Sequence, residues 1–264
     1  MGEPTTRPVT YPSCTFGIRQ TLSSLDSGWQ RFPGRYLLYA SRGGFHLEID
    51  QAHWFLPPQR AAWVAPDERI RIWADRPVTS SSVLFARTTP VPVSPTCSVF
   101  AVTPLVREMI LHAMRWPIDR NPDDELANSF FAALAAVTAE LAQEPERFWL
   151  PKPNSTWTGS LTEHIGSHLA DNLSLSTLAK KALVSERTLS RRFREDLGMS
   201  LGQYVHRARM LAALDRLAGQ DLSVSEIAWS LGFESLSSFV TAFRTFAEET
   251  PTQYRRRILG ERRS

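Results

Sequence analysis

Positive charge is concentrated in one segment of the C-terminal half of this chain. Residues 180–209 hold eight basic side chains and three acidic ones, whereas the whole chain has 30 Lys and Arg against 27 Asp and Glu. Such a local excess favours a polyanionic partner, and we therefore expect this segment to contact nucleic acid. The basic residues are Lys180, Lys181, Arg187, Arg191, Arg192, Arg194, Arg207 and Arg209.

The elements that must position these charges occur twice. Residues 175–200 and 224–251 follow one pattern, in which Phe193 matches Phe243 at an offset of 50. Each copy predicts two short helices around a tight turn, with these Phe side chains buried as anchors. A helix over 201–217 is expected between the copies as a rigid spacer. Two such units are the parts of a paired helix-turn-helix.

Helix-terminus signals support the repeat. Ser223 followed by Glu226 predicts a capping box at the first helix of the second copy. Ser185 is the expected N-cap of the second helix of the first copy, and Gly198 its left-handed C-cap.

With these motifs, residues 157–257 resemble the DNA-binding domain of the AraC/XylS family of bacterial transcription regulators. One departure is that Ala247 and Glu248 stand where the family usually has an aromatic residue and Gly. The matching motifs are Ser-x-x-x-Leu-x-x-x-Phe at 185–193, Gly-Met-Ser at 198–200, Ile-Ala at 227–228, Gly-Phe at 232–233 and Thr-Pro-x-x-Tyr-Arg at 250–255.

The resemblance implies which side chains meet DNA. Arg can fork onto guanine in the major groove, so the first unit should be specific. Hydroxyl groups discriminate less, so the second unit should bind loosely or read DNA shape. The implied base-reading residues are Arg187, Ser190 and Arg191 in the first unit and Ser237, Ser238 and Thr241 in the second, with Arg194 and Arg244 on phosphates.

The N-terminal half reads as β structure. Short apolar stretches between 36 and 86 alternate with turn residues, which predicts a small barrel or sandwich. Residues 30–87 resemble the cupin-like sensor arm of part of the same family, through Leu-Leu-Tyr-Ala at 37–40 and Leu-Pro-Pro…Ala-x-Trp-Val at 56–64.

Six residues of this arm are candidates for an effector pocket. The alternative is that the aromatic members simply fill the barrel, as aromatic side chains usually do. The candidates are Tyr39, Arg42, His46, Trp54, Trp63 and Trp73.

Neither a metal nor another cofactor is expected. Where metal cupins carry a His-x-His pair, this chain has Gln30 and Phe32. His164 and His168 have a zinc-like spacing but lack a third ligand, so we expect helix surface there.

Two helices are expected after the arm. Residues 104–114 carry Leu105 and Met109 at helical spacing, and residues 124–143 carry a stripe that begins at Leu126. The stripe fits either a core within the domain or a dimer face.

The expected fold class is α+β: a cupin-like β-barrel, two helices, then an all-α domain of two helix-turn-helix units joined by a spacer helix. The expected organisation is a flexible tail (1–15), the sensor domain (16–95), a helical pair and candidate dimerisation region (96–149), a linker (150–157) and the DNA-binding domain (158–258).

A cytoplasmic protein is expected. The N-terminus lacks an apolar signal core, and no apolar run reaches the length of a membrane span. Cys14 and Cys97 do not form a metal or redox spacing and are expected as ordinary thiols.

The leading interpretation is a ligand-responsive transcription regulator that binds double-stranded DNA and is not an enzyme. RNA polymerase, an unidentified small-molecule effector and a second copy of the chain are further candidate partners; a membrane is not. Two alternatives stay open. The barrel could bind a protein partner, or it could be a cupin enzyme fused to a DNA-binding module, which the missing metal ligands disfavour.

Overall fold

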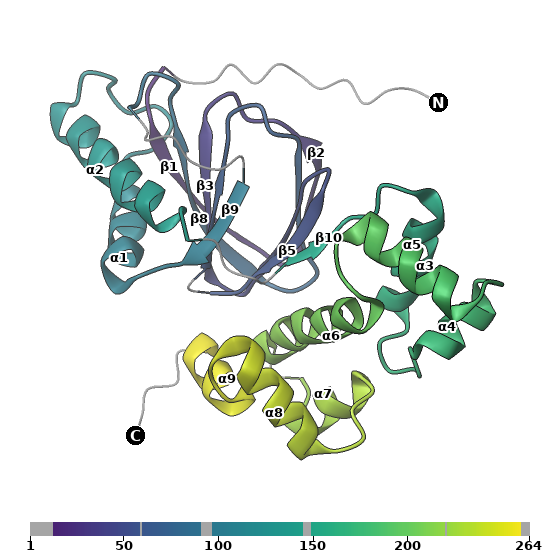
Figure 1. Cartoon of the computed structure of the whole chain (residues 1–264). Helices are drawn as coiled ribbons and strands as arrows, with labels where there is room; N and C mark the ends of the chain where they lie inside the picture. Colours follow the sequence, from purple (N-terminus) through teal and green to yellow (C-terminus); the bar gives the residue numbers. More distant parts are fainter. Residues whose placement is uncertain (1–12, 59, 91–96, 145–148, 220, 260–264) are drawn as a thin grey trace.

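The computed structural model describes residues 13–58, 60–90, 97–144, 149–219 and 221–259, and it has mixed α and β architecture (Figure 1). The strands form two five-stranded antiparallel sheets, ordered β1-β8-β3-β6-β9 and β10-β5-β4-β7-β2. The strands are β1 (Phe16–Leu22), β2 (Leu25–Gln30), β3 (Arg35–Arg42), β4 (Phe45–Glu48), β5 (Ala52–Leu56), β6 (Arg60–Val64), β7 (Ile70–Ala74), β8 (Val78–Phe85), β9 (Cys97–Ala101) and β10 (Trp149–Pro151).

The expected strands between 36 and 86 are confirmed; of the expected barrel or sandwich, the structure shows no closed barrel among the described residues. Among the described residues the strands divide into two separate sheets that pack face to face. Residues 97–101, expected within the helical-pair region (96–149), instead form β9 at the edge of the first sheet. Residues 149–151, at the expected linker, pair with β5 as β10. Of the expected tail, residues 1–12 lie outside the described residues.

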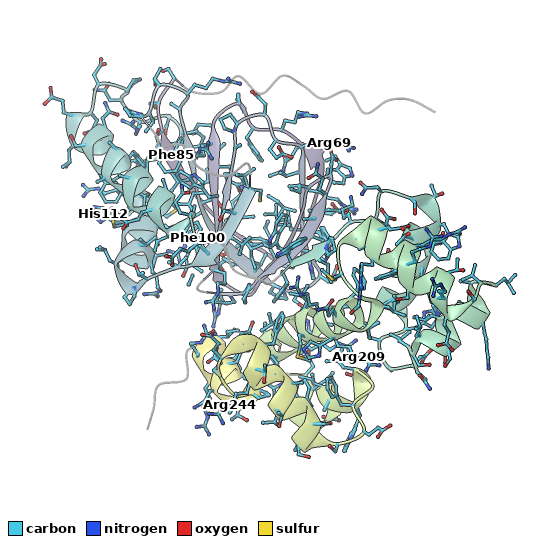
Figure 2. The ribbon with its side chains drawn as sticks, in the orientation of Figure 1. Arg69, Phe85, Phe100, His112, Arg209 and Arg244 are labelled. Carbon is cyan, nitrogen blue, oxygen red and sulfur yellow. The ribbon has the colours of Figure 1, made fainter. Side chains whose placement is uncertain are left out.

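Because side chains alternate along each strand, they point into three regions: the core between the sheets, the outer face of the first sheet and the outer face of the second sheet. On β4, Phe45 and Leu47 point into the core between the sheets, whereas His46 and Glu48 face the other way. The first sheet is buried on both faces, because helices α1 (Pro104–Ala113) and α2 (Glu125–Leu141) cover its outer side. Figure 2 labels Phe85 and Phe100, which belong to the core under these helices.

The two covering helices are rotated from the expected faces. Leu105 and Leu126 were expected on the packed faces, yet they are 64% and 65% exposed. Val106, Ile110 and Phe131 are buried against the first sheet instead. The apolar stripe therefore serves the core only in part, and Leu105 and Leu126 remain on the outer surface.

The helical half is built around α6 (Leu201–Ala218), which confirms the expected spacer helix. The remaining helices are α3 (Thr156–Ser167), α4 (Leu175–Lys181), α5 (Glu186–Leu197), α7 (Val224–Ser230), α8 (Leu236–Ala247) and α9 (Pro251–Leu259). Helix α6 contacts five other helices of this half and also β5 and β10 (Figure 1); the five are α3, α5, α7, α8 and α9. Phe55 of β5 is 1% exposed and belongs to the same core as the helices, so this half is docked on the outer face of the second sheet.

None of the helices in the described part of the chain is long and apolar enough to cross a lipid bilayer.

Candidate DNA-binding surface

Helix pairs α4–α5 and α7–α8 share one turn geometry. In the first, the Val184 amide donates to the Ala179 carbonyl at 3.1 Å. In the second, the Phe233 amide donates to the Ala228 carbonyl, also at 3.1 Å. The residue before each donor has left-handed backbone, with φ of +54° at Leu183 and +73° at Gly232. The repeat seen in the sequence is therefore a repeat of local structure.

The predicted helix caps are confirmed. Ser185 accepts a hydrogen bond at 3.2 Å from the backbone amide three residues later, and Gly198 has a φ of +67°. Ser235, which was not predicted as a cap, accepts the same bond at the start of α8. Ser223 and Glu226 form the expected capping box. Hydrogen bonds from the Ser223 side chain and amide lower the pKa of the Glu226 carboxyl. A second capping box, which our sequence reasoning missed, starts α6 at Ser200 with Gln203.

Buried anchors turn the polar faces of α5 and α8 outward. Phe193 and Phe243 are fully buried, as predicted, and fix one face of each helix in the core. Figure 2 labels Arg244 on α8, on the side turned away from the sheets. Of the predicted DNA-contacting residues, Ser190 is half-buried; exposed are Arg187, Arg191, Arg194, Ser237, Ser238, Thr241 and Arg244.

Two of these side chains already have partners within the protein. The Arg191 guanidinium donates to both carboxylate oxygens of Glu195 at 3.1 Å, one turn along α5. The Ser238 hydroxyl donates to the Ser235 carbonyl at 2.8 Å, inside the cap of α8. The Arg191 guanidinium is thus paired within its own helix, and Ser238 stabilises the helix start.

Arg209 of α6 joins the two helix pairs. Its Nε donates to the Leu169 carbonyl at 3.1 Å and its Nη2 to the Asp171 carbonyl at 3.0 Å, just before α4. Its guanidinium also lies 5.9 Å from the ring centre of Phe233 in the second turn. A Cβ at Gly232 would lie 2.8 Å from the backbone carbonyl oxygen of Ala170, and the φ of +73° also favours Gly there. Our sequence reasoning counted Arg209 only as a charge.

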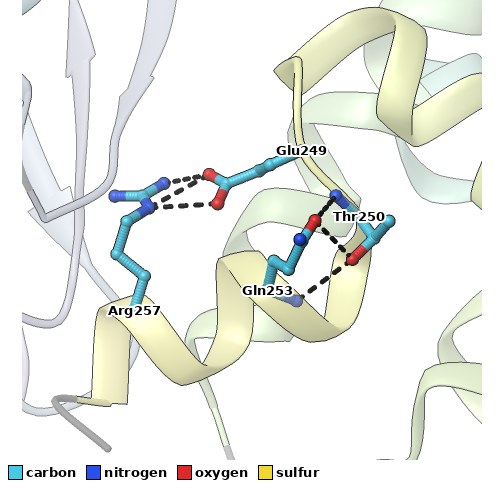
Figure 3. Close-up of polar contacts among 4 residues, drawn as sticks. All are labelled: Glu249, Thr250, Gln253 and Arg257. Atoms are coloured by element: carbon cyan, nitrogen blue, oxygen red, sulfur yellow. Dashed lines mark hydrogen bonds and ion pairs between the residues drawn. The ribbon is translucent and has the colours of Figure 1, made fainter. Parts of the chain in front are cut away.

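The last helix, α9, starts with its own cap (Figure 3). The side-chain Oε1 of Gln253 accepts a hydrogen bond from the Thr250 backbone amide at 2.9 Å, and the Gln253 backbone amide donates to the Thr250 hydroxyl at 3.3 Å. Arg257 Nε reaches back to Glu249 at 3.1 Å. Glu248, the position where the family usually has Gly, is left-handed with a φ of +61°.

The six candidate effector residues lie in three places. Tyr39 and Trp63 are buried between the first sheet and α1–α2. Trp54 lies between the two sheets. The others are on the side that meets the helical half, where His46 stacks on Trp73 with ring centres 4.9 Å apart and Arg42 shares a cavity with His46.

His46 belongs to a half-buried histidine pair. Its Nδ1 lies 3.0 Å from Nε2 of His53 on the neighbouring strand. Burial lowers the pKa of His46, and burial together with the nearby His46 and Lys152 lowers the pKa of His53 to about 3. Both rings are therefore neutral at ordinary pH.

The described residues contain no group of three or more His, Cys, Asp or Glu side chains that could hold a metal ion. The rings of His164 and His168 are 4.0 Å apart on the accessible side of α3. Cys14 and Cys97 are free thiols.

The described surface, with paired helix turns that expose arginines and hydroxyls, is that of a DNA-binding protein. Residues 178–257 match the family model described as a helix-turn-helix domain. The chain is a DNA-binding transcription regulator, and this domain is of the AraC type.

Similar proteins include the HTH-type transcriptional regulator NimR of Escherichia coli K12, 25% identical over 84% of this chain and 80% of that protein. The regulatory protein PocR of Salmonella typhimurium is 32% identical over 41% of this chain and 36% of its own length. A solved structure of a DNA-binding transcriptional dual regulator from Escherichia coli K-12 is 27% identical, with a TM-score of 0.38, over 41% of this chain and 96% of that chain.

Proposed function

We propose that this regulator reads DNA with two helix-turn-helix units, α4–α5 and α7–α8, and that α5 and α8 enter successive major grooves from one side. Such grooves recur about every 34 Å along B-DNA. The observation that carries the proposal is the shared turn, with its left-handed residue at Leu183 and at Gly232. The single helix α6 spaces the units, so one chain would contact two half-sites.

Base reading is assigned to Arg187, Ser190 and Arg191 on α5 and to Ser237, Ser238 and Thr241 on α8. Arg194 and Arg244 are assigned to phosphates. These assignments rest on family positions, and the exposure of seven of the eight side chains supports them. Because the Ser238 hydroxyl is bonded within the cap of α8, we expect it to contribute least to base reading.

The stacked sheets are proposed as a cupin-like sensor that responds to a small molecule and has no enzymatic activity. Within the proposed organisation, the sensor (16–95) and helical pair (96–149) are followed by a linker (150–157) and the DNA-binding domain (158–258). DNA as the partner implies action in the cytoplasm.

Exposed Leu105 and Leu126 favour a protein contact on the outer helices, for which a second copy of the chain is our candidate. RNA polymerase remains a further candidate partner of the DNA-bound protein.

Selection from a pool of random duplexes tests the proposed function. The full-length protein should enrich one motif with two half-sites about 10–11 base pairs apart. Raising salt from about 50 to about 200 mM should weaken binding steeply, because phosphate contacts release counterions. Enrichment of no motif, or of a single half-site, would contradict the two-groove reading.

A further inference from the structure

A cavity of about 480 Å³ lies at the junction between the second sheet and the helical half. Its size falls within the range of small-molecule sites. The sheet side contributes Arg42, His46 and Asp75, while α6 contributes Asp215. A molecule bound there would touch both halves of the protein at once.

One wall of the cavity is a link between the halves. Arg76 Nη1 donates to Asp221 Oδ2 at 2.7 Å, from the β7–β8 turn to the segment after α6. A Cβ at Gly219 would lie 1.7 Å from the same Nη1, so the backbone of this segment approaches the guanidinium directly. The charges of Arg76 and Asp221 are therefore paired with each other.

The other charged side chains of the cavity, Arg42, Asp75 and Asp215, do not form ion pairs with one another. Asp215 is half-buried, and neither it nor Arg42 forms an ion pair or hydrogen bond with any residue that the structure describes. Asp75 adds a second carboxylate on the sheet side. Burial raises the pKa of the Asp215 carboxyl, and the groups that act on it through space are His46, Arg76, Asp75 and Arg216. Burial also lowers the pKa of His46, so its ring adds no positive charge near neutral pH.

We infer that this cavity binds a small molecule that carries both an ammonium and a carboxylate group, that is, an amino acid. The ammonium lies against Asp215 and Asp75, and the Arg42 guanidinium takes the carboxylate with paired hydrogen bonds. A carboxylate left partly buried without a hydrogen bond or a close ion pair costs free energy, which a directly bound cationic group recovers. The ring of His46, which stacks on Trp73, lines the same cavity.

This inference rests on the proposed function for its meaning, because it assigns the effector class and its site. The ligand contacts both halves only while the helical half is docked on the second sheet. The ligand therefore binds the docked arrangement more tightly than any other arrangement. Such a difference in affinity is what allows a ligand to shift a conformational equilibrium.

Thermal unfolding of the full-length protein tests the site. Each common amino acid is added in turn at millimolar concentration, next to the matching amine without the carboxylate and the matching acid without the amine. At least one amino acid should raise the melting temperature by about 2 °C or more, and its two truncated forms should not. No shift with any amino acid, or an equal shift with the amine alone, would overturn the assignment.

Variants locate the binding. Asp215→Asn and the surface variant Arg42→Gln should each abolish the shift, whereas Arg69→Gln, which removes a guanidinium paired with Asp50 elsewhere on the second sheet, should retain it. A full shift in Arg42→Gln would place the ligand elsewhere. Duplex binding without any amino acid is measured in parallel. If it persists while no amino acid binds, only this inference fails; if it is absent, the proposed function fails.

Discussion

Arg191 is the residue on which sequence-specific reading by the first unit depends most. Its exposed guanidinium pairs with Glu195, one turn along α5. Replacing Arg191 by Ala should cost about 1–3 kcal/mol of binding free energy on the selected duplex and relax the preference at one base pair. Competition binding with duplexes changed at each position measures both effects.

Arg192→Ala is the matched control for this measurement. Arg192 lies on the same helix, but its guanidinium packs 5.3 Å from the ring centre of Trp157 on α3. It should therefore weaken binding little and leave the base preference unchanged. Were Arg191→Ala to weaken all duplexes equally, Arg191 would be a phosphate contact and not a base reader.

In the free protein the ion pair with Glu195 competes with DNA for the Arg191 guanidinium. Because exposed ion pairs of this kind are worth up to about 1 kcal/mol, Glu195→Gln should tighten DNA binding by a few-fold at most. The same titration of the selected duplex measures the change. Weaker binding in Glu195→Gln would mean that Glu195 positions Arg191 and does not compete with DNA for it.

Glu248 is a residue at which the chain departs from its own family pattern at a structural cost. Its φ of +61° is a conformation that Gly adopts freely and other residues do not. Glu248→Gly should raise the free energy of unfolding by about 0.5–1 kcal/mol after the entropy of the unfolded chain is allowed for. Urea unfolding measures the change.

Thr245→Gly, inside α8, supplies the opposite control and should destabilise by about 1 kcal/mol. A destabilised Glu248→Gly would show that the Glu248 side chain makes a compensating contribution.

At the scale of elements, Arg209 is expected to fix how the two helix pairs are oriented. Arg209→Ala removes its bonds to the Leu169 and Asp171 carbonyls and its contact with Phe233. Binding to the two-half-site duplex should fall about tenfold, because looser units gain less from being linked. Binding to a single half-site should be almost unchanged.

Arg207→Ala, whose guanidinium instead lies 5.9 Å from the ring centre of Trp149, should not separate the two duplexes. Equal losses on both duplexes in Arg209→Ala would indicate a general loss of stability, which the melting temperature would confirm.

Elements with strong periodicity or caps were predictable, and edge elements were not. The helix over 201–217 and the capping box at Ser223 follow from apolar spacing and hydroxyl-acid pairs. Strand β2 alternates only weakly and is largely accessible, and β10 is three residues long, so neither has a pattern that distinguishes it from a loop. In β8 every residue is buried, which hides the alternation that reveals a half-buried strand.

The effector residues show why the site was only partly predictable. Alternation along β4 and β7 identifies strands, but it does not say which buried face meets which neighbour. Trp63 and Trp73 look alike in sequence, yet one faces α1–α2 and the other faces the helical half. Arg42 and His46 meet at a cavity completed by α6, which is more than a hundred residues away in the chain.

At the scale of the whole molecule, the half-buried His46–His53 pair makes stability depend on pH. Burial holds the pKa of His53 at about 3, below its ordinary value of 6.5. Between these values the unfolded chain binds a proton that the folded chain does not, so stability is lost as pH falls below about 6.5. Lys152 adds to the depression at His53, while Asp215 and Asp75 oppose the lowering at His46.

Between pH 7 and pH 5 this should cost about 1–2 kcal/mol of unfolding free energy. The midpoints of urea unfolding at the two pH values measure the loss, which His53→Gln should reduce. An unchanged pH dependence in His53→Gln would show that other groups cause it.

The central claim is that one chain places two reading helices on one face of the duplex, a helical turn apart. Hydroxyl-radical footprinting of the full-length protein on its selected duplex tests it most directly. We expect two protected patches on the same face, with centres about 10–11 base pairs apart. One patch alone, patches on opposite faces, or no protection above that of unrelated DNA would contradict it.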